Sequence, residues 1–187
     1  MFLGHFAMGV GTKPFAPKLP VWVLLLAPQF MDLLFMPLVA LGVEGYEPGP
    51  YGHDVLNALY THSLVGAVVI SLGAYAIGRY AWKTVRSGLI LGGLCFSHWI
   101  IDLFVHHQDM PLLPGNLGGF PKLGLGLWDY EYVIFGLEVV MAVVGVGLYA
   151  RWSMQARPSA RWYVGPLIVT VLFGLMIMGD VPRLPPL

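Results

Sequence analysis

Two residues near the middle of the chain, His98 and Asp102, have the types and the spacing to carry out chemistry together. They stand four residues apart, so on a helix both side chains lie on one face, one turn from each other. An imidazole and a carboxylate at that spacing can share a metal ion, or they can hydrogen-bond to each other. Both belong to an apolar run that begins near Gly88, where an ionisable group is costly and is by default a functional candidate.

The chain holds further histidines and carboxylates that can join this pair: His5, Asp32, His62, His106 and Glu138. Imidazole and carboxylate ligands suit zinc, manganese or iron. We therefore predict a site for a divalent metal, with zinc as the favoured ion. The predicted metal ligands are Asp32, His62, His98, Asp102 and His5. His5 reaches the site only if residues 1–12 enter the membrane as a short re-entrant helix.

A hydrolytic metal site keeps one position open for a water molecule and lowers the pKa of that water. Glu138 and His106 are the predicted catalytic residues, as a base or as groups that support the ligands; alternatively they hold a second ion. The same residues also allow a polar network that joins the helices without metal. A haem held by His62 and His98 is less favoured beside so many carboxylates. Proton transport is less favoured in a chain without an internal repeat.

The composition is that of a multi-pass membrane protein. Of 187 residues, 57% are hydrophobic and 11% are charged, whereas soluble domains carry about 25% charged residues. We predict an all-α integral membrane bundle that forms a single transmembrane domain over 1–187. The net charge is zero, so we expect no nucleic-acid partner. The single Cys95 excludes an internal disulfide and a site built from several cysteines.

Five apolar segments are long enough to cross a membrane, and we place them at 20–43, 56–78, 87–108, 132–150 and 162–179. Pro28 and Pro37 lie inside the first segment and predict a kink. With a rise of about 1.5 Å per residue, the candidate histidines and carboxylates of the first four segments reach a similar depth. That depth is the middle-to-outer part of an apolar core about 30 Å thick.

The charged residues in the loops predict the orientation. Most basic residues fall in three places: Lys13 and Lys18; Arg79, Lys83 and Arg86; Arg151, Arg157 and Arg161. The loop acids fall on the opposite side: Glu44, Glu47 and Asp54; Asp109, Asp129 and Glu131; Asp180. By the positive-inside rule, the N-terminus is cytoplasmic and the C-terminus is outside. The longer outer loop, 109–130, is rich in glycine and proline, and we expect it to cover the site with Trp128.

Several short stretches resemble a family of small bacterial multi-pass membrane proteins of uncharacterised function. They are Gly4-His5-Phe6-Ala7, Gln29-Phe30-Met31-Asp32-Leu33-Leu34, Thr61-His62-Ser63-Leu64, Ser97-His98-Trp99 with Asp102, His106 with Asp109, and Gly124-Leu125-Gly126-Leu127-Trp128. More distantly, the pattern is similar to inner-membrane metal-dependent hydrolases, and more loosely to zinc-dependent phospholipase C. The resemblance implies the inner (cytoplasmic) membrane of a bacterium and metal-dependent hydrolysis. The usual Pro-Asp-x-Asp of the hydrolases is reduced here to Asp32, which leaves one metal, or a degenerate site without metal.

We therefore predict a metal-dependent hydrolase of a lipid-like or phosphoester substrate, with membrane lipid as its partner. The competing hypothesis is a non-catalytic accessory subunit of a larger respiratory or photosynthetic membrane complex, held by other membrane subunits. The small size and the apolar surface of a helical bundle motivate this second hypothesis. Metal content separates the two, because only the hydrolase needs an ion.

Overall fold

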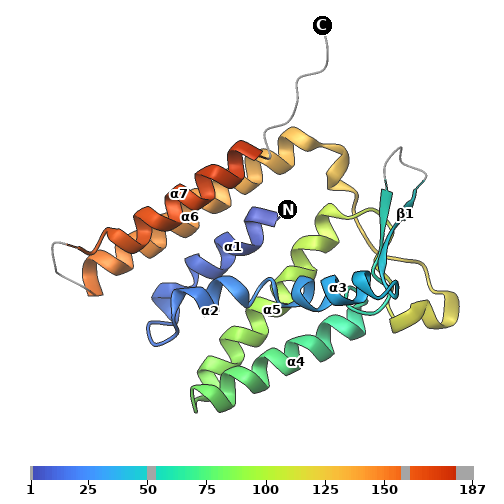
Figure 1. Cartoon of the computed structure of the whole chain (residues 1–187), viewed down its shortest axis with the longest axis horizontal. Helices are drawn as coiled ribbons and strands as arrows, with labels where there is room; N and C mark the ends of the chain where they lie inside the picture. The colour runs from blue at the N-terminus through green and yellow to red at the C-terminus, as the bar shows by residue number, and fades with distance from the viewer. Residues whose placement is uncertain (1, 50–53, 157–160, 180–187) are drawn as a thin grey trace, which may run out of the picture. The chain divides into compact units, whose positions relative to one another are not determined.

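The computed structural model describes residues 2–49, 54–156 and 161–179, and these residues are mostly helical (Figure 1). The predicted all-α class is confirmed. The structure adds a small antiparallel hairpin that was not predicted, formed by β1 (Gly45–Pro48) and β2 (Asp54–Asn57).

The chain divides into two compact units. We call Met1–Leu26 with Tyr130–Leu187 the terminal unit, and Ala27–Asp129 the middle unit. Each unit joins residues that pack around a core of its own. The single domain over 1–187 stays a prediction.

The terminal unit consists of α1 (Phe2–Gly11), η1 (Lys13–Phe15), α2 (Val21–Leu26), α6 (Glu131–Ala156) and α7 (Val164–Gly179). α6 and α7 run side by side in Figure 1, drawn in orange and red. α1 and α2 approach so closely that a side chain at Gly9 would overlap the carbonyl group of Leu24. The core of this unit is apolar and contains Leu3, Ala7, Val10, Ala142, Tyr149, Val169 and Phe173.

The middle unit consists of α3 (Phe30–Ala40), β1, β2, α4 (Leu64–Ala81), α5 (Val85–Val105), η2 (Pro114–Gly119) and η3 (Leu127–Asp129). α4 and α5 form a helical hairpin in which each helix begins at a hydroxyl cap. Ser63 Oγ accepts from the backbone N–H of Gly66 at 3.0 Å, and Thr84 Oγ1 accepts from that of Ser87 at 3.1 Å. At Gly78 an added Cβ would lie 2.7 Å from the carbonyl oxygen of Ser87, so glycine permits the close packing of the two helices.

The described residues contain three helices long and apolar enough to cross a membrane, α4, α5 and α6. They have 18, 21 and 26 residues, against the roughly 20 residues that a bilayer core requires. α7 has 16 residues and α3 has 11, so both are apolar but shorter. Membrane association is therefore supported by three of the five predicted segments, and the five-span bundle stays a prediction.

The first predicted segment, 20–43, is not one helix. α2 ends at Leu26, and α3 begins at Phe30. Pro28 lies in the break, where it lacks the N–H that a continuing helix needs and disfavours the helical conformation of Ala27. Pro37, by contrast, lies inside α3. The predicted kink is thus a complete interruption at one proline.

The second predicted segment, 56–78, begins too early. Residues 54–57 form β2, and the helix begins only at Leu64, after the Ser63 cap. His62 therefore lies in a loop and not inside a spanning helix, and its predicted depth within that helix is wrong. Ala58 and Leu59 are also apolar, so the apolar pattern alone does not show that the helix begins only at Leu64.

Candidate metal centre

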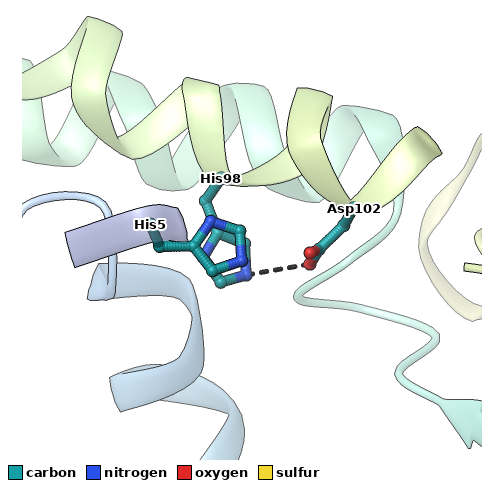
Figure 2. Close-up of side chains that lie close together, drawn as sticks. All are labelled: His5, His98 and Asp102. Carbon is teal, nitrogen blue, oxygen red and sulfur yellow. Dashed lines mark ion pairs between the residues drawn. The ribbon is translucent and has the colours of Figure 1, made fainter. Parts of the chain in front are cut away.

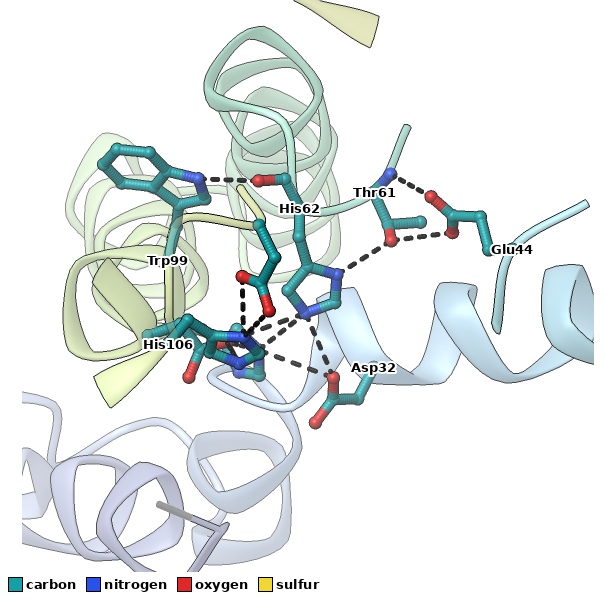
Figure 3. Close-up of polar contacts among 9 residues, drawn as sticks. Asp32, Glu44, Thr61, His62, Trp99 and His106 are labelled. Carbon is teal, nitrogen blue, oxygen red and sulfur yellow. Dashed lines mark hydrogen bonds and ion pairs between the residues drawn. The ribbon is translucent and has the colours of Figure 1, made fainter. Parts of the chain in front are cut away.

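Four predicted ligands come together inside the middle unit. Asp32 lies in the first turn of α3, and His62 lies in the loop before α4. His98 and Asp102 lie on one face of α5, one turn apart, as their spacing predicts (Figure 2). Figure 3 shows the imidazole of His62 and the carboxylate of Asp32 pointing toward each other.

The ligand atoms of the four residues are close to one another. His62 Nε2 lies 3.3 Å from His98 Nε2 and 3.4 Å from Asp32 Oδ1. His62 Nε2 also lies 3.6 Å from Asp102 Oδ2. His98 Nε2 lies 3.0 Å from Asp102 Oδ2 and 3.5 Å from Asp32 Oδ1. Each of the two imidazole nitrogens thus lies near the other and near one oxygen of Asp32 and one of Asp102.

These separations fit one small metal ion. In a tetrahedral zinc site with bonds of about 2.0–2.1 Å, neighbouring ligand atoms lie about 3.4 Å apart. The five pairs that include a histidine nitrogen are 3.0 to 3.6 Å apart. Asp32, His62 and His98 in particular offer ligand atoms that all lie within 4.8 Å of one another. The donor set and its spacing therefore suit zinc or a similar divalent ion.

The cluster is closed on most sides. His62, His98 and Asp102 are buried, with at most 4% of each residue exposed. The side chain of Asp32 is 33% exposed. A ligand or a water molecule from outside would therefore meet the cluster at Asp32.

Both the backbone and the ring of His62 are held by contacts with neighbouring residues. The indole N–H of Trp99 donates to the carbonyl oxygen of His62 at 2.9 Å. The ring of Phe35 meets the imidazole edge-on, with the ring centroids 5.5 Å apart. On the side away from the cluster, His62 Nδ1 lies 2.9 Å from Thr61 Oγ1, which donates to Glu44 (Figure 3).

Glu44 and Thr61 are site residues that the sequence analysis missed in this role. Glu44 was assigned only to a loop, yet it is buried and binds the loop that carries His62. Thr61 appeared only as part of the Thr61-His62-Ser63-Leu64 stretch. A hydroxyl residue directly before a candidate ligand was the signal that could have found Thr61. Nothing in the sequence pairs it with Glu44.

His106 lies at the edge of the cluster, immediately after the last residue of α5. Its Nε2 atom is 3.9 Å from Asp102 Oδ2, which is beyond direct hydrogen bonding. Its Nδ1 atom is 3.2 Å from Asp109 Oδ1. Asp109 is itself fixed, because its Oδ2 atom accepts from the backbone N–H of Leu56 at 3.2 Å.

The loop after α5 brings Trp128 to the site. The ring centroids of Trp128 and His106 are 4.1 Å apart. The backbone N–H of Gly126 donates to the carbonyl oxygen of His106 at 2.7 Å. Gly124 has a φ of +143°, and a side chain there would overlap the carbonyl group of His107. The loop therefore depends on glycine to lie this close to the end of α5.

Two predicted site residues, His5 and Glu138, belong to the terminal unit. His5 lies on α1 and is the third residue drawn in Figure 2. Glu138 Oε1 accepts from the backbone N–H of Leu3 at 3.1 Å, so its carboxylate lies at the N-terminus of α1, where the helix dipole favours a negative charge. The roles of His5 as a ligand and of Glu138 as a base stay predictions.

No family model matches the chain, and no curated protein and no solved structure match it either. The resemblance to small bacterial membrane proteins and to metal-dependent hydrolases therefore stays a prediction. The chemistry of the site rests on its own geometry.

Proposed function

We propose that the cluster of Asp32, His62, His98 and Asp102 binds one divalent metal ion, zinc in the first place. The observation that carries this proposal is the set of five ligand-atom separations between 3.0 and 3.6 Å. A haem fits this geometry less well, because its two axial histidines need room for the macrocycle between them. Here the two Nε2 atoms are 3.3 Å apart, and both face the same oxygen of Asp32.

We further propose that the protein is a membrane-bound, metal-dependent hydrolase of a lipid-like or phosphoester substrate. When bound, the metal supplies an acidified water molecule and polarises the substrate oxygen. The protein supplies the base. Asp109 accepts the Nδ1 proton of His106, which leaves the Nε2 lone pair of His106 facing the cluster. His106 Nε2 then takes the proton of the attacking water and returns it to the leaving alcohol oxygen as the ester bond breaks, and Trp128 covers the imidazole from one side.

The surroundings of the site support a lipid-like substrate. Two of the three candidate spanning helices, α4 and α6, expose most of their apolar residues, because only 22% and 28% of their most apolar 18-residue stretches are buried. A substrate with an apolar tail can diffuse in the same layer and reach the exposed side of Asp32. The proposed location is the inner membrane of a bacterium, with a cytoplasmic N-terminus, and the proposed partner is membrane lipid.

The experiment that tests this function is a measurement of bound metal in the detergent-purified protein by elemental mass spectrometry. The wild type is compared with Asp32→Asn, His98→Ala and Asp102→Ala. Asp129→Ala is the matched control, because it removes an aspartate that pairs with a histidine, His107, at 2.9 Å. We expect about one ion per chain in the wild type and the control, and loss of the ion in the three cluster variants.

Folded wild-type protein that takes up no zinc would refute the proposal. The cluster would then be a polar network that joins the helices, and the accessory-subunit hypothesis would take its place. Stable co-purification with other membrane subunits would support that hypothesis. If metal is bound, hydrolysis of short-chain phospholipids and of simple phosphodiesters is the next assay.

A further inference from the structure

A chain of hydrogen bonds lies behind His62, on the side away from the cluster. Thr61 Oγ1 is 2.9 Å from His62 Nδ1, and it donates to Glu44 Oε2 at 2.8 Å. All three residues are buried, with at most 5% of each exposed. Water therefore does not compete for these bonds, and the protons must be shared among the three side chains.

Counting protons fixes the direction of each bond. A threonine hydroxyl has one proton, and a carboxylate can only accept. If Thr61 gives its proton to Glu44, Thr61 Oγ1 can only accept from the imidazole. His62 Nδ1 must then carry a hydrogen. In a neutral imidazole with hydrogen on Nδ1, the lone pair is on Nε2, which is the atom that faces the cluster.

Glu44 is held in place by the same loop that it orients. Its Oε1 atom accepts from the backbone N–H of Tyr60 at 2.6 Å and from that of Thr61 at 2.9 Å. Together with the Thr61 hydroxyl, three donors converge on one carboxylate. Because a carboxylate can only accept, the Thr61 hydroxyl is the donor in its bond to Glu44.

We propose that Glu44 and Thr61 are positioning residues that hold His62 in the Nδ1–H form, so that Nε2 is free to bind the metal. The role in metal binding rests on the proposed metal site. The hydrogen on Nδ1 does not, because it follows from the bonds to Thr61 and Glu44, whereas the aspartate oxygens at 3.4 and 3.6 Å act on the other ring nitrogen, Nε2. Partners of this kind behind a metal-binding histidine contribute about 10–100-fold to metal affinity.

The test uses three variants at the two positions. Thr61→Val removes the hydroxyl and keeps the branched shape. Thr61→Ser restores the hydroxyl. Glu44→Gln puts an amide N–H₂ where Oε2 stands, so that it donates to Thr61 Oγ1 and releases the hydroxyl proton to His62 Nδ1. Thr170→Val is the control, because Thr170 lies on α7 and its hydroxyl donates to the carbonyl oxygen of Pro166 in the same helix.

Two measurements are made on each protein. The first is the ¹⁵N spectrum of the His62 ring in metal-free protein at about pH 8, where ordinary imidazoles are neutral, with His62→Gln to assign it. The second is the zinc Kd, from competition with a chelator. We expect hydrogen on Nδ1 in the wild type, Thr61→Ser and Thr170→Val, a mixture in Thr61→Val, and a shift toward Nε2 in Glu44→Gln. The Kd should rise about 10–100-fold in Thr61→Val and Glu44→Gln, and less than about 3-fold in the other two.

The outcomes separate this inference from the proposed function. A His62 ring with hydrogen on Nε2 and none on Nδ1 in the metal-free wild type overturns the inference. So does a zinc Kd in Thr61→Val and Glu44→Gln that equals the wild-type value. If the wild type shows hydrogen on Nδ1 yet binds no zinc, the proposed function fails and the positioning of the His62 proton stands. If Thr61→Val does not fold, Glu44→Gln against Thr61→Ser decides the same question.

Discussion

Replacing Trp99 by phenylalanine should destabilise the loop that carries His62. The carbonyl oxygen of His62 cannot be satisfied by α4, because the helix begins after the Ser63 cap and its first turn bonds to Ser63 instead. The indole N–H of Trp99 donates to that oxygen at 2.9 Å. Phenylalanine keeps an aromatic ring on α5 but removes the only part of Trp99 that makes this bond.

The expected loss of stability can be estimated from two terms. A buried polar group left without its partner costs about 1–3 kcal/mol. Trp99 is 5% exposed, so the smaller ring also leaves a void in the core, at a cost of about 1 kcal/mol. The sum is about 2–4 kcal/mol. Trp22→Phe is the matched control, because Trp22 is 63% exposed and the change should cost less than about 0.5 kcal/mol.

The assay is reversible unfolding in mixed micelles, followed by circular dichroism because both changes remove a fluorescent tryptophan. The metal-free protein is used, so that ligand binding does not enter. If Trp99→Phe and Trp22→Phe lose the same free energy of unfolding, the bond does not hold the loop, and the reasoning about the His62 carbonyl is refuted.

Three further predictions concern the proposed metal site and its loop. His106→Gln should keep the bound metal, because His106 Nε2 lies 3.9 Å from Asp102 Oδ2, at the edge of the cluster. The change should lower kcat for phosphoester hydrolysis by about 10²–10⁴. Loss of metal instead would make His106 a ligand. Chelation should lower stability by about 2.7 kcal/mol relative to protein at free zinc one hundred times Kd, as measured by thermal unfolding, and no change would argue against binding to the folded state. Gly124→Ala should displace Trp128 from His106, because a side chain at position 124 overlaps the His107 carbonyl group. Unchanged tryptophan fluorescence and unchanged kcat would contradict this prediction.

The sequence predicts best what a single helix determines. The pairing of His98 with Asp102 follows from a spacing of four residues, and α5 at Val85–Val105 lies close to the predicted 87–108. The convergence of Asp32 and His62 on this pair was expected from depth, although the depth of His62 was computed from a helix that does not contain it. The bond between Glu44 and Thr61 joins residues 17 positions apart through tertiary structure, and no local pattern contains it.

The error in the first segment has a consequence for the site. In an unbroken helix over 20–43, Asp32 would lie in the middle of an apolar helix, where a carboxylate is hardest to accommodate. Because the chain breaks at Pro28, α3 begins at Phe30, and Asp32 lies in the first turn, where free backbone N–H groups and the helix dipole favour a negative charge.

The second segment is also interrupted near the site, because α4 begins only at Leu64 and His62 lies in the loop before it. Thr61 can then reach its ring and Trp99 can reach its carbonyl oxygen. Two of the four candidate ligands therefore stand where apolar segments are interrupted. In a continuous helix the His62 carbonyl oxygen would accept a hydrogen bond from within the helix. It would then not require the bond from the indole N–H of Trp99. The interruptions that hydropathy overlooks are thus the features that hold the site together.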